Sequence, residues 1–78
     1  MSASTTARTA AEFKVRGLTA ELINAIANRD EAAVNANAAI NGNSFARISA
    51  RYTLTTATAH YLDTLYAHAD AEATLASS

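Results

Sequence analysis

The sequence SFARISARYTLTTATAHYLDTLYAHADAEATL, residues 44–75, places apolar or small side chains at alternating intervals of three and four residues. This is the heptad spacing of a helix that buries one stripe of its surface against another helix. The stripe consists of Phe45, Ile48, Tyr52, Thr55, Ala59, Leu62, Tyr66, Ala69 and Ala73. The pattern therefore predicts one long helix over residues 44–75 that packs against other helices.

A second stripe runs beside the first along the same expected helix. It consists of Leu54, Tyr61, Leu65 and His68. Together the two stripes cover more of the circumference than one partner helix buries. We expect the segment before residue 44 to pack along this helix as an antiparallel hairpin, which leaves the second stripe for an N-terminal helix or another subunit.

The rest of the chain also favours helix, because alanine dominates it and proline is absent. Asn41-Gly42-Asn43 is typical of a tight turn, and Gly17 is expected to end an earlier helix. Thr9 and Glu12 have the spacing of a capping box, so a short helix is expected over residues 9–16. A second helix is expected over 19–40, with a possible break near 28–30, where Asn28 resembles another cap.

The expected fold is therefore all-α: a short N-terminal helix, then an antiparallel helical hairpin with a long C-terminal helix. Residues 9–76 form a single helical domain, preceded by a Ser/Thr/Ala-rich arm at 1–8 and followed by a tail at 77–78. A core in a chain of 78 residues supplies only about 3–5 kcal/mol, and no cysteine is present for disulfides or thiolate metal sites. Packing as an oligomeric helical bundle, or docking on a larger body, is the remaining way to gain stability.

Charge along the expected last helix suggests how two copies meet. Arg47 and Arg51 lie near its start, whereas Asp70 and Glu72 lie near its end, against the usual preference of the helix dipole. We hypothesise that two copies cross antiparallel near Ala59, which brings the arginines of one copy toward the acidic residues of the other. The candidate interface residues are Phe45, Ile48, Arg51, Tyr52, Thr55, Ala59, Leu62, Tyr66, Ala69 and Glu72.

An equally weighted alternative keeps these charges within one chain. Arg51 would then face Asp30 or Glu31 across the hairpin, and the small residues Thr55 to Ala59 would receive the first helix. Both versions make the last helix a packing surface. They differ in whether the partner is the same chain or a second copy.

No residues suggest an enzyme, a metal site or a cofactor site. His60 and His68 lie eight residues apart, too far along a straight helix to bind one ion together, so solvated surface histidines are expected. No serine lies in a glycine-flanked elbow, and Gly17 and Gly42 are isolated glycines without a phosphate-binding pattern. We therefore expect no catalytic, cofactor-binding or metal-binding residues and no small-molecule substrate.

The expected function is a non-enzymatic helical interaction or assembly module, self-associating or an accessory subunit of a virion, filament or multiprotein complex. The alternative is a small regulatory binder or inhibitor, or a hairpin dimer that binds nucleic acid. A net charge of −1 argues against a general electrostatic grip on nucleic acid or on an anionic membrane. The sequence has no signal-like or membrane-length apolar run, so we expect a soluble protein, cytoplasmic or inside an assembled particle.

Overall fold

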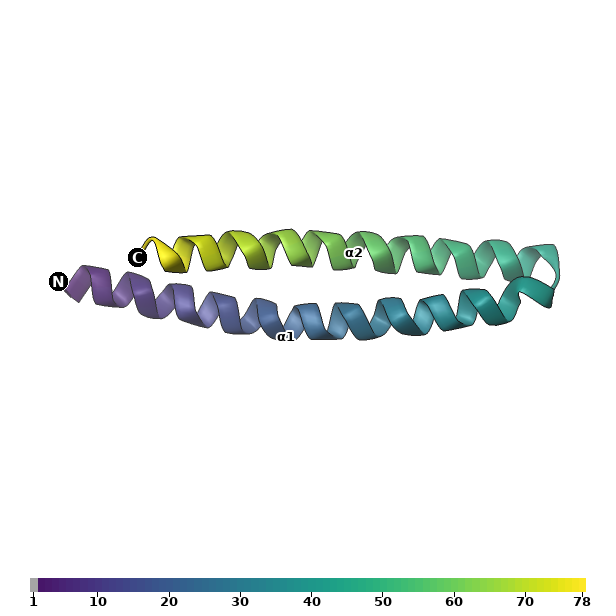
Figure 1. Cartoon of the computed structure of the whole chain (residues 1–78), viewed down its shortest axis with the longest axis horizontal. Coiled ribbons are helices and arrows are strands. Elements are labelled where there is room, and N and C mark those ends of the chain that lie inside the picture. The colour runs from purple at the N-terminus through teal and green to yellow at the C-terminus, as the bar shows by residue number, and fades with distance from the viewer. Residues whose placement is uncertain (1) are drawn as a thin grey trace.

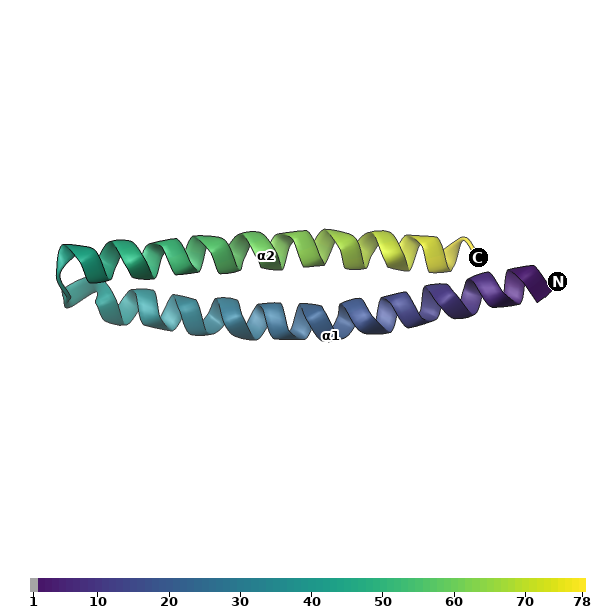
Figure 2. The same cartoon turned by 180° about the vertical axis from the view of Figure 1, so that it is seen from behind.

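Two long helices lie side by side and antiparallel along the whole molecule. The structure is a computed structural model that describes residues 2–78, with side chains from Thr5 onward. Helix α1 spans Ser2–Ala38, the short 3-10 helix η1 spans Ala39–Asn41, and helix α2 spans Ser44–Ala76. The result is a rod of 62 × 13 × 13 Å with the turn at one end and both termini at the other (Figure 1). The view from behind shows the same two-helix arrangement (Figure 2). The prediction of an all-helical hairpin is confirmed.

Helix α1 is continuous, so the expected separate helix over residues 9–16 is not confirmed. It runs through Gly17 and through residues 28–30 without a break, and its α-helical part ends at Ala38 rather than at residue 40. Glycine inside a helix costs only about 1 kcal/mol relative to alanine. Val15, Leu18 and Leu22 keep packing toward α2 across Gly17, and this continuous contact outweighs that cost.

The start of α1 also differs from the expected capping box. Thr9 Oγ1 donates a hydrogen bond to the Thr5 carbonyl at 3.0 Å, as a hydroxyl inside a helix does. Glu12 instead pairs with Arg8 one turn earlier, with 3.3 Å between Arg8 Nε and Glu12 Oε1. Residues 2–8 of the expected N-terminal arm are therefore part of α1, whereas Met1 lies outside the described residues.

The turn forms where Asn41-Gly42-Asn43 predicted it. Gly42 N donates to the Ala39 carbonyl at 2.9 Å, and Asn43 Oδ1 accepts from Ala46 N at 2.8 Å as the N-cap of α2. Arg47 reaches back and donates to the Gly42 carbonyl at 2.8 Å. A side chain at Gly42 would lie 3.2 Å from the Ala39 carbonyl oxygen, so the tight reversal favours glycine here.

The seam between the helices is built mainly from alanine. Ala25, Ala32, Ala71 and Thr64 are the buried residues of the described chain, each at most 5% exposed. Larger seam residues are half-buried: Val15, Leu18 and Leu22 from α1, and Leu54, Tyr61, His68 and Leu75 from α2. Small side chains let the two backbones approach closely, so little apolar volume fits between them.

The two stripes of α2 are placed the other way round from the sequence-based expectation. Leu54, Tyr61 and His68 of the second stripe turn toward α1, and Leu65 lies at the edge of the seam. The heptad stripe that begins at Phe45 faces away from α1. Both stripes have helical spacing, but Leu54, Tyr61 and His68 share their face of α2 with the small residues Ala57, Thr64 and Ala71, so large and small side chains alternate along the seam.

Candidate interaction surface

The outward stripe of α2 is the most exposed apolar feature of the described chain. We call it the outer stripe; it comprises Phe45, Ile48, Tyr52, Thr55, Ala59, Leu62, Tyr66, Ala69 and Ala73. Phe45 is 81% exposed, Tyr52 74% and Tyr66 71%. Ile48 and Leu62 are exposed as well. Exposed apolar stripes of this kind are typical of sites that contact another molecule.

Helical spacing explains why the outer stripe points away from α1. Buried Ala71 and Thr64 recur seven residues apart on the seam, as do Ala50 and Ala57 before them. Residues two positions after these, such as Tyr52, Ala59 and Tyr66, are rotated about 200° around the helix. The same heptad period therefore produces two apolar faces on opposite sides of α2.

Arg51 and Glu72 flank the outer stripe on the same side of α2, because they lie 21 residues, or three heptads, apart. Both are exposed. No ion pair joins Arg51 to Asp30 or Glu31 within the described part of the chain, where the two ion pairs found are Arg8–Glu12 and His68–Glu72. Arg51 is thus available to a partner, as is most of the Glu72 carboxylate.

Helix α1 adds further exposed apolar side chains. They are Phe13, Ile23, Ile26, Val34 and Ile40. Near the turn, a groove between the helices joins this apolar surface to the outer stripe. Its lining consists of Ala33, Ala36, Asn37, Ile40, Arg47, Ile48, Arg51 and Leu54. Sequence reasoning did not find this groove, because it depends on which residues of α1 lie opposite α2.

On the opposite flank of the hairpin, α1 presents the exposed amide side chains of Asn28 and Asn35. A shallow hollow there is lined by Asn28, Tyr52, Thr53, Thr56, Ala57 and His60. Exposed Asn35 follows Asn28 by one heptad on this flank of α1, so the polar character continues along the rod. The groove adjoins the outer stripe at Ile48 and the hollow adjoins it at Tyr52. The two flanks differ in α1, which presents apolar side chains beside the groove and amides on the other side, which we call the polar flank.

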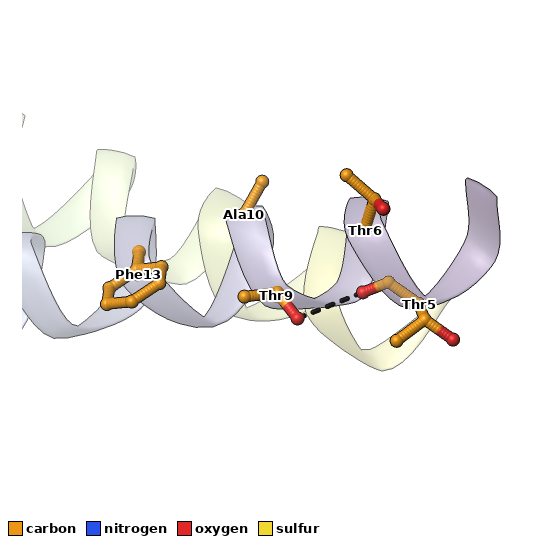
Figure 3. Close-up of a pocket in the computed structure, with 5 residues that line it drawn as sticks. All are labelled: Thr5, Thr6, Thr9, Ala10 and Phe13. Carbon is orange, nitrogen blue, oxygen red and sulfur yellow. Dashed lines mark hydrogen bonds between the residues drawn. The ribbon is translucent and has the colours of Figure 1, made fainter. Parts of the chain in front are cut away.

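A third hollow lies at the N-terminal end of α1, where Figure 3 shows Thr5, Thr6, Thr9, Ala10 and Phe13 along one side of the helix. The hydrogen bond from Thr9 to the Thr5 carbonyl stays within the helix. Exposed Phe13 supplies the largest apolar side chain there. The hollow has lining residues from one helix alone, so it forms an open surface.

His68 connects the two helices, which corrects the expectation that both histidines are solvated. Its side chain is only 16% exposed, and its Nε2 lies 2.8 Å from Thr19 Oγ1. The Thr19 hydroxyl donates to the Val15 carbonyl at 2.8 Å, so its oxygen accepts the hydrogen bond from His68 Nε2. Nδ1 of His68 faces Glu72 Oε1 at 3.5 Å. His60 is exposed, as expected.

An aromatic contact also joins the helices across the seam. The Arg29 guanidinium carbon lies 5.3 Å from the centre of the Tyr61 ring. Arg29 occupies a seam position of α1, and its guanidinium lies over the Tyr61 ring of α2 as a cation–π contact. The charged Arg29 side chain thus takes part in the packing between the two helices.

The described residues contain no group of three or more His, Asp or Glu side chains arranged to hold a metal ion. Within the same residues, neither helix is both long and apolar enough to cross a membrane. No model of a protein family matches the chain, and no curated protein or solved structure is similar enough to count as a match. The exposed side chains of the two helices are therefore the basis for a proposed function.

Proposed function

We propose that this hairpin is a non-enzymatic assembly module that completes its core by packing against other helices, in the first place those of further copies of itself. One observation carries the proposal. Among the described residues, eleven large apolar side chains are at least 36% exposed, whereas the fully buried residues are three alanines and one threonine. Most of the apolar surface that could stabilise the fold is still in contact with water.

The stabilisation that burial of these exposed side chains would give is large enough to support association. Burying a Leu, Ile or Phe side chain stabilises a protein by about 1.5–3 kcal/mol. Full burial of only three or four of the exposed residues would therefore match the total stability of many small domains, which starts at about 5 kcal/mol. A two-helix hairpin with an alanine seam gains little from its own interior, so association and stability are coupled.

The arrangement of the surface supports a helical partner rather than a small ligand. The outer stripe is a straight line of side chains on a helix of 33 residues, and the groove beside it is open and shallow. Another helix matches such a line along its whole length, whereas a small molecule needs a concave site. An accessory subunit of a larger helical assembly fits this description.

Thermal unfolding followed by far-UV circular dichroism tests the proposal. We expect the melting temperature of the chain to rise by several degrees over a hundredfold range of concentration, because association stabilises only the folded form. Replacing Tyr66 with aspartate should remove this dependence, whereas replacing exposed Asn35 on the polar flank with aspartate should preserve it. A melting temperature independent of concentration would contradict self-association.

A further inference from the structure

We infer that two copies pair through their outer stripes, antiparallel, with the two-fold axis level with the segment between Ala59 and Leu62. The inference deepens the proposed self-association and rests on it. The partner is a second copy of this chain, because the stripe complements itself in both side-chain size and charge. These two properties point to the same alignment.

Size complementarity selects the alignment first. In an antiparallel pair, each layer joins one residue of the stripe to one of the other copy, and large side chains pack best against small ones. One alignment puts a larger residue opposite a smaller one in every central layer. Its layers are Ile48 with Ala73, Tyr52 with Ala69, Thr55 with Tyr66, and Ala59 with Leu62.

The hairpin already uses the same kind of packing in its own interior. The Thr19–His68 hydrogen bond shows which residues of the two helices lie level. Counting along both helices from this bond places Ala25 near Tyr61 and Ala32 near Leu54. Ala25 is 1% exposed and Ala32 4%, as expected for small residues covered by large neighbours. The outer stripe contains both large and small residues, and the antiparallel alignment above places them opposite one another in the same way.

Charge complementarity gives the same alignment independently. Flanking residues of two antiparallel heptad stripes face each other in pairs, and this alignment brings Arg51 of each copy beside Glu72 of the other. The symmetry makes the ion pair twice. On the other flank, Asp63 falls beside Thr56 and Asp70 beside Ser49, so no like charges meet. All these side chains are exposed in the hairpin, and Glu72 also lies 3.5 Å from His68 Nδ1 through its Oε1.

Other alignments lose one or both properties. A parallel pair in register stacks Tyr52 on Tyr52 and Tyr66 on Tyr66, and it separates Arg51 from Glu72 by about 30 Å along the helices. An antiparallel pair shifted by one heptad places Tyr52 opposite Leu62 and Thr55 opposite Ala59, so large residues meet large ones. That shift also places Arg51 beside Leu65 instead of Glu72.

Disulfide trapping tests the alignment, because the chain has no cysteine of its own. The reporting variant carries Tyr52→Cys and Ala69→Cys, which lie about 25 Å apart on one helix and therefore cannot pair within a chain. A second reporter, Ile48→Cys with Ala73→Cys, samples another layer. The controls are Tyr52→Cys with Leu62→Cys for the shifted alignment and Tyr52→Cys alone for the parallel one.

Under mild oxidation we expect both reporters to form covalent dimers at least tenfold faster than either control on a non-reducing gel. Faster trapping of a control would overturn the alignment. Light scattering then gives the mass of each reduced variant and of the unmodified chain. These masses distinguish failure of the alignment from failure of self-association. An associated unmodified chain whose controls trap faster disproves the alignment alone, whereas a monomeric unmodified chain disproves self-association and the alignment together.

Discussion

At the scale of single residues, Thr19 and His68 make a hydrogen bond between the two helices toward the free ends of the hairpin, with 2.8 Å between Thr19 Oγ1 and His68 Nε2. Replacing Thr19 with valine keeps the shape of the side chain but leaves the His68 donor without its acceptor. We expect the free energy of unfolding to fall by about 1 kcal/mol, the contribution of a typical hydrogen bond. Urea denaturation measures this loss. Thr19→Ser keeps the hydroxyl and should retain most of the stability.

Replacing Gly17 is expected to stabilise the hairpin rather than destabilise it. It lies inside α1, is exposed, and has no atom within 4 Å of the position where a Cβ would be. Gly17→Ala should therefore raise the free energy of unfolding by up to about 1 kcal/mol, because alanine favours helix. A loss of stability in urea denaturation would instead mean that the chain needs glycine for a break at this point.

At the scale of the helices, the close approach of α1 and α2 depends on the small residues of the seam. Ala32→Leu adds bulk where the side chain is 4% exposed, and such overpacking costs about 1–3 kcal/mol. We expect a lower melting temperature by circular dichroism. Ala27→Leu is the matched control, because Ala27 is exposed on the same helix. Equal effects of the two substitutions would contradict the alanine seam.

Parts of this architecture follow directly from the sequence. Asn41-Gly42-Asn43 predicted the turn because both the cap from Asn43 and the tight approach at Gly42 are local interactions. The continuity of α1 was not predicted, because the local stop at Gly17 is weak and packing of Leu18 and Leu22 toward α2 outweighs it.

The candidate surface was predicted in part. Heptad spacing predicts the outer stripe as a packing face, but the stripe with Leu54 and Tyr61 fits a helical period as well, and periodicity cannot rank the two. The choice depends on Ala25 and Ala32 in α1, which lie beside the larger side chains. The Thr19–His68 contact was missed for the same reason, since it joins residues 49 positions apart.

At the scale of the whole molecule, the charges of Arg51 and Glu72 beside the outer stripe are expected to affect the affinity between two copies. Arg51→Glu and Glu72→Arg should each weaken association several-fold, because each creates two like-charge contacts in the antiparallel pair. The double variant should associate more tightly than Glu72→Arg. Glu72→Arg is the matched reference, because both variants lack the contact between Glu72 and His68. Sedimentation velocity at low salt gives the affinities. No recovery in the double variant would argue against the pairing of Arg51 with Glu72.

We propose that this rod has an incomplete core, which other helices complete. Light scattering behind a sizing column, over a range of concentrations, measures the absolute mass and tests the claim directly. The account predicts a discrete species at a multiple of 8.1 kDa that persists on dilution into the micromolar range. An 8.1 kDa monomer at every concentration that nevertheless unfolds cooperatively would contradict it, because eleven exposed large apolar side chains would then contribute nothing to a stable fold.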